Sequence, residues 1–147
     1  MMQTLKEKRP LGVKVAIAAL ILLAITSIGG GKVLLDDPSG ESMGIQFIAP
    51  HLPFNLHDFL LVGIWLIAVF GVLSVILSVG LLARKNWARI ATLGLGIVVV
   101  TWILSEVYMF YSFGFVFFYP LIGGIGVLEI ITMALPSTRQ YFQRVKQ

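Results

Sequence analysis

Two carboxyl groups inside long apolar stretches are the residues best placed to do chemistry in this 147-residue chain. Glu106 occurs in WILSEVYM and Glu129 in GGIGVLEII. An ionised carboxylate in hydrocarbon costs about 2.5–3.5 kcal/mol on insertion scales, so such residues usually face other helices and have a partner. No Lys, Arg or His lies deep in these stretches to pair with them. We therefore expect one or both carboxyls to be protonated, and to serve either a ligand or a neighbouring helix.

Hydroxyl side chains accompany the first of these carboxyls. Thr101, Ser105 and Tyr108 recur at the i, i+4 and i+7 positions that share one helical face beside Glu106. They form a candidate site for a small hydrophobic or protonatable ligand. Glu106 is expected near one face of the bilayer and Glu129 nearer the other, about 15 Å apart at about 1.5 Å per residue. That separation predicts that the two carboxyls do not share one proton or one metal ion.

The elements that must position these residues are four apolar segments, each about long enough to cross a bilayer as a helix. The predicted helices cover residues 11–28, 59–83, 87–110 and 116–135. Mean hydropathy is +0.94 and only 12% of residues are charged. A soluble domain needs more polar surface than this, so the chain is predicted to be a single all-α membrane domain, a bundle of four transmembrane helices.

The basic residues give the bundle an orientation. All the Lys and Arg residues except Lys32 lie in segments that four spans would bring to one side of the membrane. Cytoplasmic segments are enriched in Lys and Arg, so we expect cytoplasmic termini in a multi-pass protein of the plasma (inner) membrane. Because the basic residues flank spans, the net charge of +4 predicts contact with membrane lipids and not with nucleic acid.

The segment between residues 28 and 59 is predicted to be an extracytoplasmic loop. Gly29–Gly31 is expected to end the first helix, and the Asp-Pro-Ser-Gly sequence 37–40 suits a turn within a short hairpin. Asp58 is expected to complement the positive end of the second helix. The loop residues considered as a site are Asp36, Asp37, Pro38, Gly40, His57 and Asp58. Their spacing matches no metal motif, and no metal is expected.

Small residues cluster on two of the predicted helices, where they would let another helix approach closely. Gly71, Ser74 and Ser78 share a face of the second helix. Gly123, Gly124 and Gly126 lie in the fourth. Pro120 would kink the fourth helix if it lies inside it, and it fits the first turn if the helix begins at Tyr119, which is the preferred interpretation. Pro136 is expected to stop that helix.

Several classes of chemistry have no support in the sequence. The chain has no cysteine, which excludes disulfides, thiolate metal sites and cysteine catalysis. No nucleophile triad, phosphate-binding loop or zinc-binding helix is recognisable. We therefore expect no cofactor and no enzymatic activity.

Three stretches carry a resemblance to a known group of proteins. The runs GGGKVLLDDPSGESMGI and LPFNLHDFLLVGIWL, and the later WILSEVYM, resemble a family of small prokaryotic four-span membrane proteins. In that family a Gly-rich helix end leads to an Asp-Pro-Ser-Gly outer loop. The family has no assigned activity, so the resemblance implies fold and topology only.

Two functions follow as expectations. The first is a non-enzymatic structural or accessory component that forms a homo-oligomer or joins a larger membrane complex through its small-residue faces. The second is a binder or carrier of a small hydrophobic or protonatable ligand that uses the intramembrane carboxylates.

Overall fold

The computed structural model describes residues 8–110 and 119–143, and in these ranges every regular element is a helix and no strand occurs. The elements are α1 (Leu11–Asp36), η1 (Glu41–Met43), η2 (Gln46–His51), η3 (Pro53–Asn55), α2 (Leu60–Trp65), η4 (Leu66–Val72), α3 (Leu73–Leu82), α4 (Asn86–Phe110), α5 (Tyr119–Ala134) and α6 (Pro136–Gln143). The all-helical prediction is confirmed for these residues.

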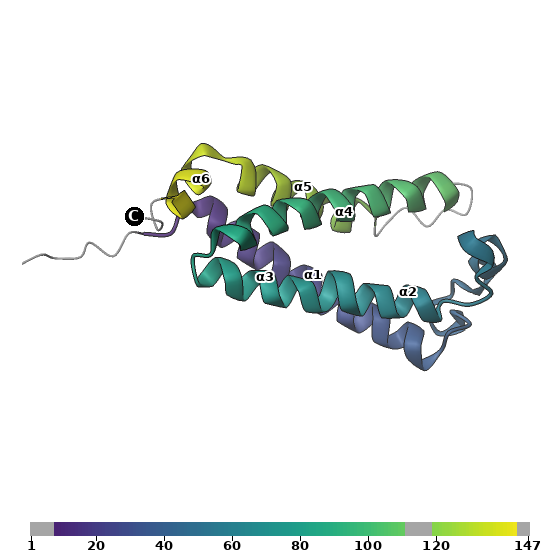
Figure 1. Ribbon diagram of the computed structural model, residues 1–147. Coiled ribbons are helices and arrows are strands. Elements are labelled where there is room, and N and C mark those ends of the chain that lie inside the picture. The colour runs from purple at the N-terminus through teal and green to yellow at the C-terminus, as the bar shows by residue number, and fades with distance from the viewer. Residues whose placement is uncertain (1–7, 111–118, 144–147) are drawn as a thin grey trace, which may run out of the picture.

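The long helices form an antiparallel bundle (Figure 1). α1 packs against α2, η4 and α3 on one side and against α5 on the other, while α4 and α5 make the most extensive pairing. Figure 1 shows the start of α1, the α3–α4 turn and α6 gathered at one end, which we call the base. The segments η1–η3 lie at the opposite end, which we call the loop end.

The first helix continues to Asp36, so the prediction that Gly29–Gly31 ends it is wrong. Glycine ends helices where a left-handed residue is needed, but no positive φ occurs in this triplet. A Cβ atom on Gly31 would lie 2.8 Å from the carbonyl oxygen of Gly63 and 2.6 Å from Ile67 Cγ1. Gly31 therefore serves the close approach of α1 to α2 and not helix termination.

The connection after α1 forms short 3₁₀ turns in place of the predicted hairpin, which is also wrong for the described residues. The predicted turn at 37–40 is present, because the Gly40 N–H donates to the Asp37 carbonyl at 3.2 Å. The N–H of Phe59 then donates to the Pro38 carbonyl at 2.8 Å and joins the two ends of the connection. Leu34, Ile48 and Phe59 are buried together beneath it. Packing of these three side chains thus stabilises the loop end. A hairpin would instead be stabilised by hydrogen bonds between paired strands.

The second predicted helix is confirmed as one continuous helix over 60–82, with a change of winding in the middle. The backbone from Leu66 to Val72 is a π-helix, and regular α-helix resumes at Leu73. A tight turn follows, in which the N–H groups of Arg84 and Lys85 donate to Leu81 and Gly80 carbonyls at 3.1 and 2.9 Å. These paired bonds form a Schellman motif, which needs a left-handed residue, and Arg84 supplies it at φ 56°.

The last two described helices are joined at a bend. α5 is described from Tyr119, and the expected position of Pro120 in the first turn depends on a helix start that adjoins residues outside the described ranges. α5 ends at Ala134, and Pro136 begins α6 at an angle of 59° to it. α5 thus stops before Pro136, as predicted, and the chain continues from Pro136 as a second, short helix over residues 136–143. The amphipathic sequence of α6 explains the bend, since Tyr141 and Phe142 are buried against the base.

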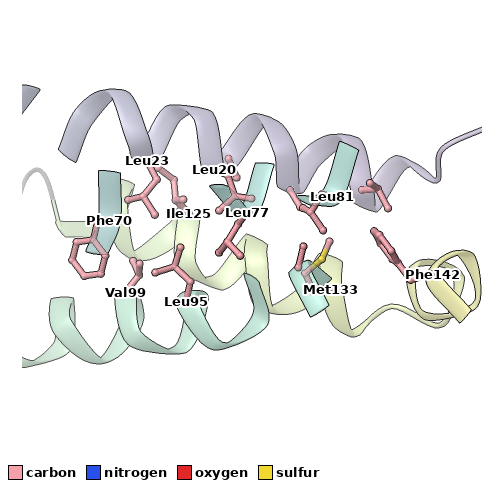
Figure 2. Close-up of a cluster of buried hydrophobic side chains, with 14 of the residues drawn as sticks. Leu20, Leu23, Phe70, Leu77, Leu81, Leu95, Val99, Ile125, Met133 and Phe142 are labelled. Carbon is pink, nitrogen blue, oxygen red and sulfur yellow. The ribbon is translucent and has the colours of Figure 1, made fainter. Parts of the chain in front are cut away.

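One hydrophobic core runs along the bundle (Figure 2). Figure 2 shows Phe70, Leu23 and Val99 toward one end and Leu81, Met133 and Phe142 toward the other. These side chains come from four different long helices and α6, so each helix depends on the others for burial.

The outer surface of this bundle is apolar as well. Large side chains such as Ile25, Val79 and Leu104 are more than half exposed. Three helices are long and apolar enough to cross a membrane, namely α1, residues 60–82 and residues 86–108, and the bent pair α5–α6 makes a fourth if it is one span. A surface of this kind is stable in lipid and not in water, which identifies the chain as a membrane protein.

Replacing single glycines of the triplet tests why α1 continues through it. Gly31→Ala should lower the free energy of unfolding by about 1–3 kcal/mol, because its Cβ would collide with the backbone of α2. Gly29→Ala meets nothing within 4 Å. It should be neutral, or stabilise the helix by up to about 1 kcal/mol. Unfolding of both variants in detergent measures the difference, and equal effects would rule out the close-approach explanation.

Candidate functional site

Glu129 is the most deeply buried ionisable side chain of the described residues, at 0% exposure. It projects from α5 where that helix crosses α4. A Cβ on Gly96 of α4 would lie 2.7 Å from the Gly126 carbonyl oxygen and 3.1 Å from Glu129 Cβ. Neither carboxyl oxygen of Glu129 has a hydrogen-bond partner within the described part of the chain. The crossing thus encloses a carboxyl group without satisfying it, a costly arrangement in an apolar interior.

Buried hydroxyl groups of α3 and α4 are also unpartnered in the described residues. Thr92 lies one helical turn from Gly96 on the same face of α4, and its hydroxyl has no partner in the described ranges. The hydroxyl of Ser74 in α3 is equally buried and unpartnered there. Sequence analysis missed Thr92. The i, i+4 spacing of Thr92 and Gly96 was a usable signal, since it places the hydroxyl on the helix-packing face.

Glu106 has a different environment, because a neighbouring indole satisfies it. The Trp102 Nε1–H donates to Glu106 Oε1 at 2.8 Å, one turn back along α4. Trp102 is itself held by Trp65, stacked at a centroid distance of 6.1 Å, and by Phe70, edge-on at 6.0 Å. Glu106 is therefore fixed by an aromatic cluster that joins α2, η4 and α4.

The hydroxyl stripe beside Glu106 does not converge on it. Thr101 and Ser105 are exposed and donate to the carbonyls one turn back, Ile97 and Thr101, at 2.8 and 2.9 Å. Tyr108 is 89% exposed. The stripe forms part of a shallow groove along α4 lined by Ile97, Val98, Thr101, Trp102 and Ser105. Because both small hydroxyls are already bonded, the groove offers mainly apolar surface.

The two carboxyls are far apart, as the sequence predicts. Glu129 lies beside Gly96 of α4. Glu106 follows Gly96 by ten residues in the same helix, which corresponds to about 15 Å at about 1.5 Å per residue. No group of three His, Asp or Glu side chains in the described residues could hold a metal ion. The carboxyls are separate sites, each with its own helix neighbours.

The small residues of the second helix are used inside the bundle. Gly71 faces Ile28 of α1, where a Cβ would lie 2.6 Å from Ile28 Cγ1. Ser74 and Ser78 are buried, and the Ser78 hydroxyl donates to the Ser74 carbonyl at 2.8 Å. These three residues therefore make contacts within the chain and offer no free face.

The small residues of the last apolar helix point in different directions. Gly126 meets Gly96 of α4, and Gly123 lies near Ile103 with a Cβ distance of 3.4 Å. Gly124 faces open space among the described residues, with nothing within 4 Å of its Cβ position. Only Gly124 thus remains unoccupied by internal packing.

In the loop end, Asp37 organises its own turn. It accepts hydrogen bonds from the N–H and hydroxyl groups of both Ser39 and Ser42, the two Ser42 bonds each at 2.7 Å. The hydrogen bond from the Ser39 hydroxyl, followed by that from the Ser42 hydroxyl, lowers the pKa of Asp37 to about 2. Gly40 follows at φ 76°, a conformation that favours glycine. This network is structural, since every donor comes from the same loop.

The remaining loop residues of the candidate set are dispersed. Asp36 forms an ion pair with Lys32 on α1. Asp58 accepts a hydrogen bond from the Leu60 N–H at 3.0 Å, as expected at the start of the second helix. His57 is exposed.

Acidification tests the Asp37 network. A carboxylate whose folded pKa lies below its ordinary 3.8 stabilises the turn fully above that value, and the contribution is lost as pH falls through about 2. The protection of the Ser39 and Ser42 amides, measured relative to their intrinsic exchange rates, should therefore fall between about pH 4 and pH 2. Asp37→Asn should abolish this pH-dependent loss of protection, and Asp36→Asn should keep it. If the loss of protection persists in Asp37→Asn, a titrating group other than Asp37 causes it.

The chain stands apart in comparisons with known proteins. No family model matches it, and neither a curated protein nor a solved structure is similar to it. Its function must therefore be argued from the geometry of the bundle.

Proposed function

We propose that this chain is a four-span protein of a prokaryotic plasma membrane with both termini in the cytoplasm. The fourth span would be the α5–α6 pair, bent at Pro136. The distribution of Lys and Arg supports this orientation. Arg9, Arg84 and Arg139 belong to the segments that Figure 1 shows at the base, and the acidic residues Asp36, Asp37, Glu41 and Asp58 belong to the loop end.

Within that membrane we propose a non-enzymatic accessory role, in which the chain self-associates or joins a larger membrane complex. The observation that carries this proposal is the groove along α4. Thr101 and Ser105 are small, exposed and one turn apart, and their hydroxyls are bonded to their own helix. Small residues at this spacing let a second helix approach closely in lipid. The groove replaces Gly71, Ser74 and Ser78 as the expected contact face.

Filling the groove should disrupt association. Thr101→Leu and Ser105→Leu put bulky side chains where a partner helix would dock, so the mass of the complex extracted from native membranes should fall. Thr26→Leu is the matched control, because Thr26 is also exposed on a long helix and donates to the carbonyl one turn back, at 2.9 Å. Native mass spectrometry measures the complex. An unchanged mass in both groove variants would exclude this face.

A second candidate function is favoured by Glu129. A buried carboxyl with no partner in the described chain is available to a proton or to a protonatable ligand. Glu106 is less suited to this role because Trp102 already donates to it. In this alternative the protein binds or carries a small ligand, and α4 and α5 separate near Gly96 to admit it.

Methionine substitutions measure whether Glu129 lowers stability. Glu129→Met should raise the free energy of unfolding by about 1–3 kcal/mol, because it removes an unsatisfied polar group while keeping side-chain volume. Glu106→Met should give no such gain, since it breaks the bond from Trp102. Equilibrium unfolding in detergent compares the two variants. A less stable Glu129→Met protein would mean that the carboxyl makes a stabilising polar interaction, which would contradict its unsatisfied state.

A further inference from the structure

A second pocket lies at the base of the bundle, beside the bend between α5 and α6. It is lined by Arg89, Ile90 and Leu93 of α4, by Ala134 at the end of α5, and by Arg139 of α6. The 59° bend at Pro136 turns α6 across the base, so that Arg139 borders the same space as Arg89. Two guanidinium groups from different helices therefore share one small volume.

Arg89 is held in position by its own helix and by α5. Its Nη1 donates to the Met133 carbonyl at 3.2 Å and its Nε to Asn86 Oδ1 at 3.2 Å. A guanidinium carries five N–H donors, so others remain after these two bonds. The Arg89 side chain is half-buried and Arg139 is exposed. One arginine thus forms a fixed wall of the pocket and the other a rim.

No acidic side chain of the described residues balances these two charges. The ion pair of the described residues joins Lys32 to Asp36, at the loop end and away from the pocket. Glu129 lies one turn farther into α5 than Met133 and makes no bond through its carboxyl in the described chain. Two like charges facing one space repel each other, and an anion between them removes that cost.

Two other arginines of the base make contacts away from this pocket. The Arg84 guanidinium lies over the Tyr141 ring at 4.9 Å, and Arg9 Nη2 donates to the Leu82 carbonyl at 3.3 Å. Arg89 and Arg139 differ from these because they border a pocket together.

The apolar lining indicates which anion fits. Ile90 is 56% exposed and, with Leu93 and Ala134, forms the hydrocarbon wall of the pocket. Trp87, also exposed and one turn nearer the start of α4, marks the depth at which headgroups lie. A free phosphate ion would use only the arginines. A phospholipid uses both parts, the phosphate at the guanidiniums and an acyl chain along Ile90.

We infer that this pocket binds the phosphodiester headgroup of an anionic phospholipid between Arg89 and Arg139. Arg89 supplies a forked donor set preorganised by Met133 and Asn86, and Arg139 closes over the headgroup from α6. The bound lipid then bridges α4 to the α5–α6 bend. Basic pockets between spans at one membrane face are the usual form of such sites.

The full-length protein in nanodiscs tests this inference, with phosphatidylglycerol and phosphatidylcholine of identical acyl chains as probes. Native mass spectrometry should show phosphatidylglycerol retained in preference to phosphatidylcholine. Arg139→Gln should weaken that retention about fivefold, as expected for one basic residue at a lipid surface. Lys85→Gln removes an exposed charge at the same end but outside the pocket, and it should leave retention unchanged.

A second variant and a competitor make the result decisive. Arg89→Lys keeps the charge but not the forked geometry, so it too should lower the preference for phosphatidylglycerol. Excess inorganic phosphate should not displace the lipid. Equal losses of retention in Arg139→Gln and Lys85→Gln would mean that general surface charge, and not the pocket, attracts the lipid. Displacement of the lipid by inorganic phosphate would mean that the pocket binds anions without recognising the lipid. Unaltered retention in both arginine variants would overturn the inference.

Discussion

The close contact of helix backbones at paired glycines is the constraint on which this bundle depends. Gly31 meets Gly63 where α1 crosses α2, and Gly96 meets Gly126 where α4 crosses α5. Lipid supplies no hydrophobic drive for helices to associate, so van der Waals contact between closely packed helices must hold them together. At each crossing a single methyl group would reach a backbone carbonyl of the other helix. Backbone contact at these glycines therefore fixes how closely each helical pair approaches, and the hydrophobic core fills the space between the pairs.

Features far from the glycines follow from these crossings. Because α1 passes Gly63 without stopping, it carries Leu34 to the loop end, where that side chain anchors the small core with Ile48 and Phe59. Because α4 and α5 touch at Gly96, Glu129 is enclosed between them. The same pairing holds Arg89 against the Met133 carbonyl. The loop core, the buried carboxyl and the basic pocket are thus consequences of where the helices touch.

Much of the fold could be predicted from the sequence, because long apolar segments have one stable form in a bilayer. The helices over 60–82 and 86–110 match those expectations closely. Glycine misled the prediction, since the same residue either ends a helix or permits close packing, and only tertiary contacts decide between these roles. Gly31 is the example where a predicted helix end is a close packing contact, whereas Pro136 marks the end of α5 as predicted and also begins α6. Both carboxyls were identified as candidates, but their partners depended on side-chain directions that periodicity does not contain.

The contrast between Glu106 and Glu129 has a local cause. One turn before Glu106 stands Trp102, whose indole N–H reaches the carboxyl. One turn before Glu129 stands Ile125, a buried side chain with no donor. Glu106 is thus satisfied within its own helix, whereas the carboxyl of Glu129 has no partner in the described chain. In the proposed ligand-binding alternative, α4 and α5 would separate near Gly96, and the Met133 carbonyl would then move away from Arg89, one turn nearer the base. Under the two proposals, occupancy of the Glu129 site and of the arginine pocket would therefore be coupled through the α4–α5 contact.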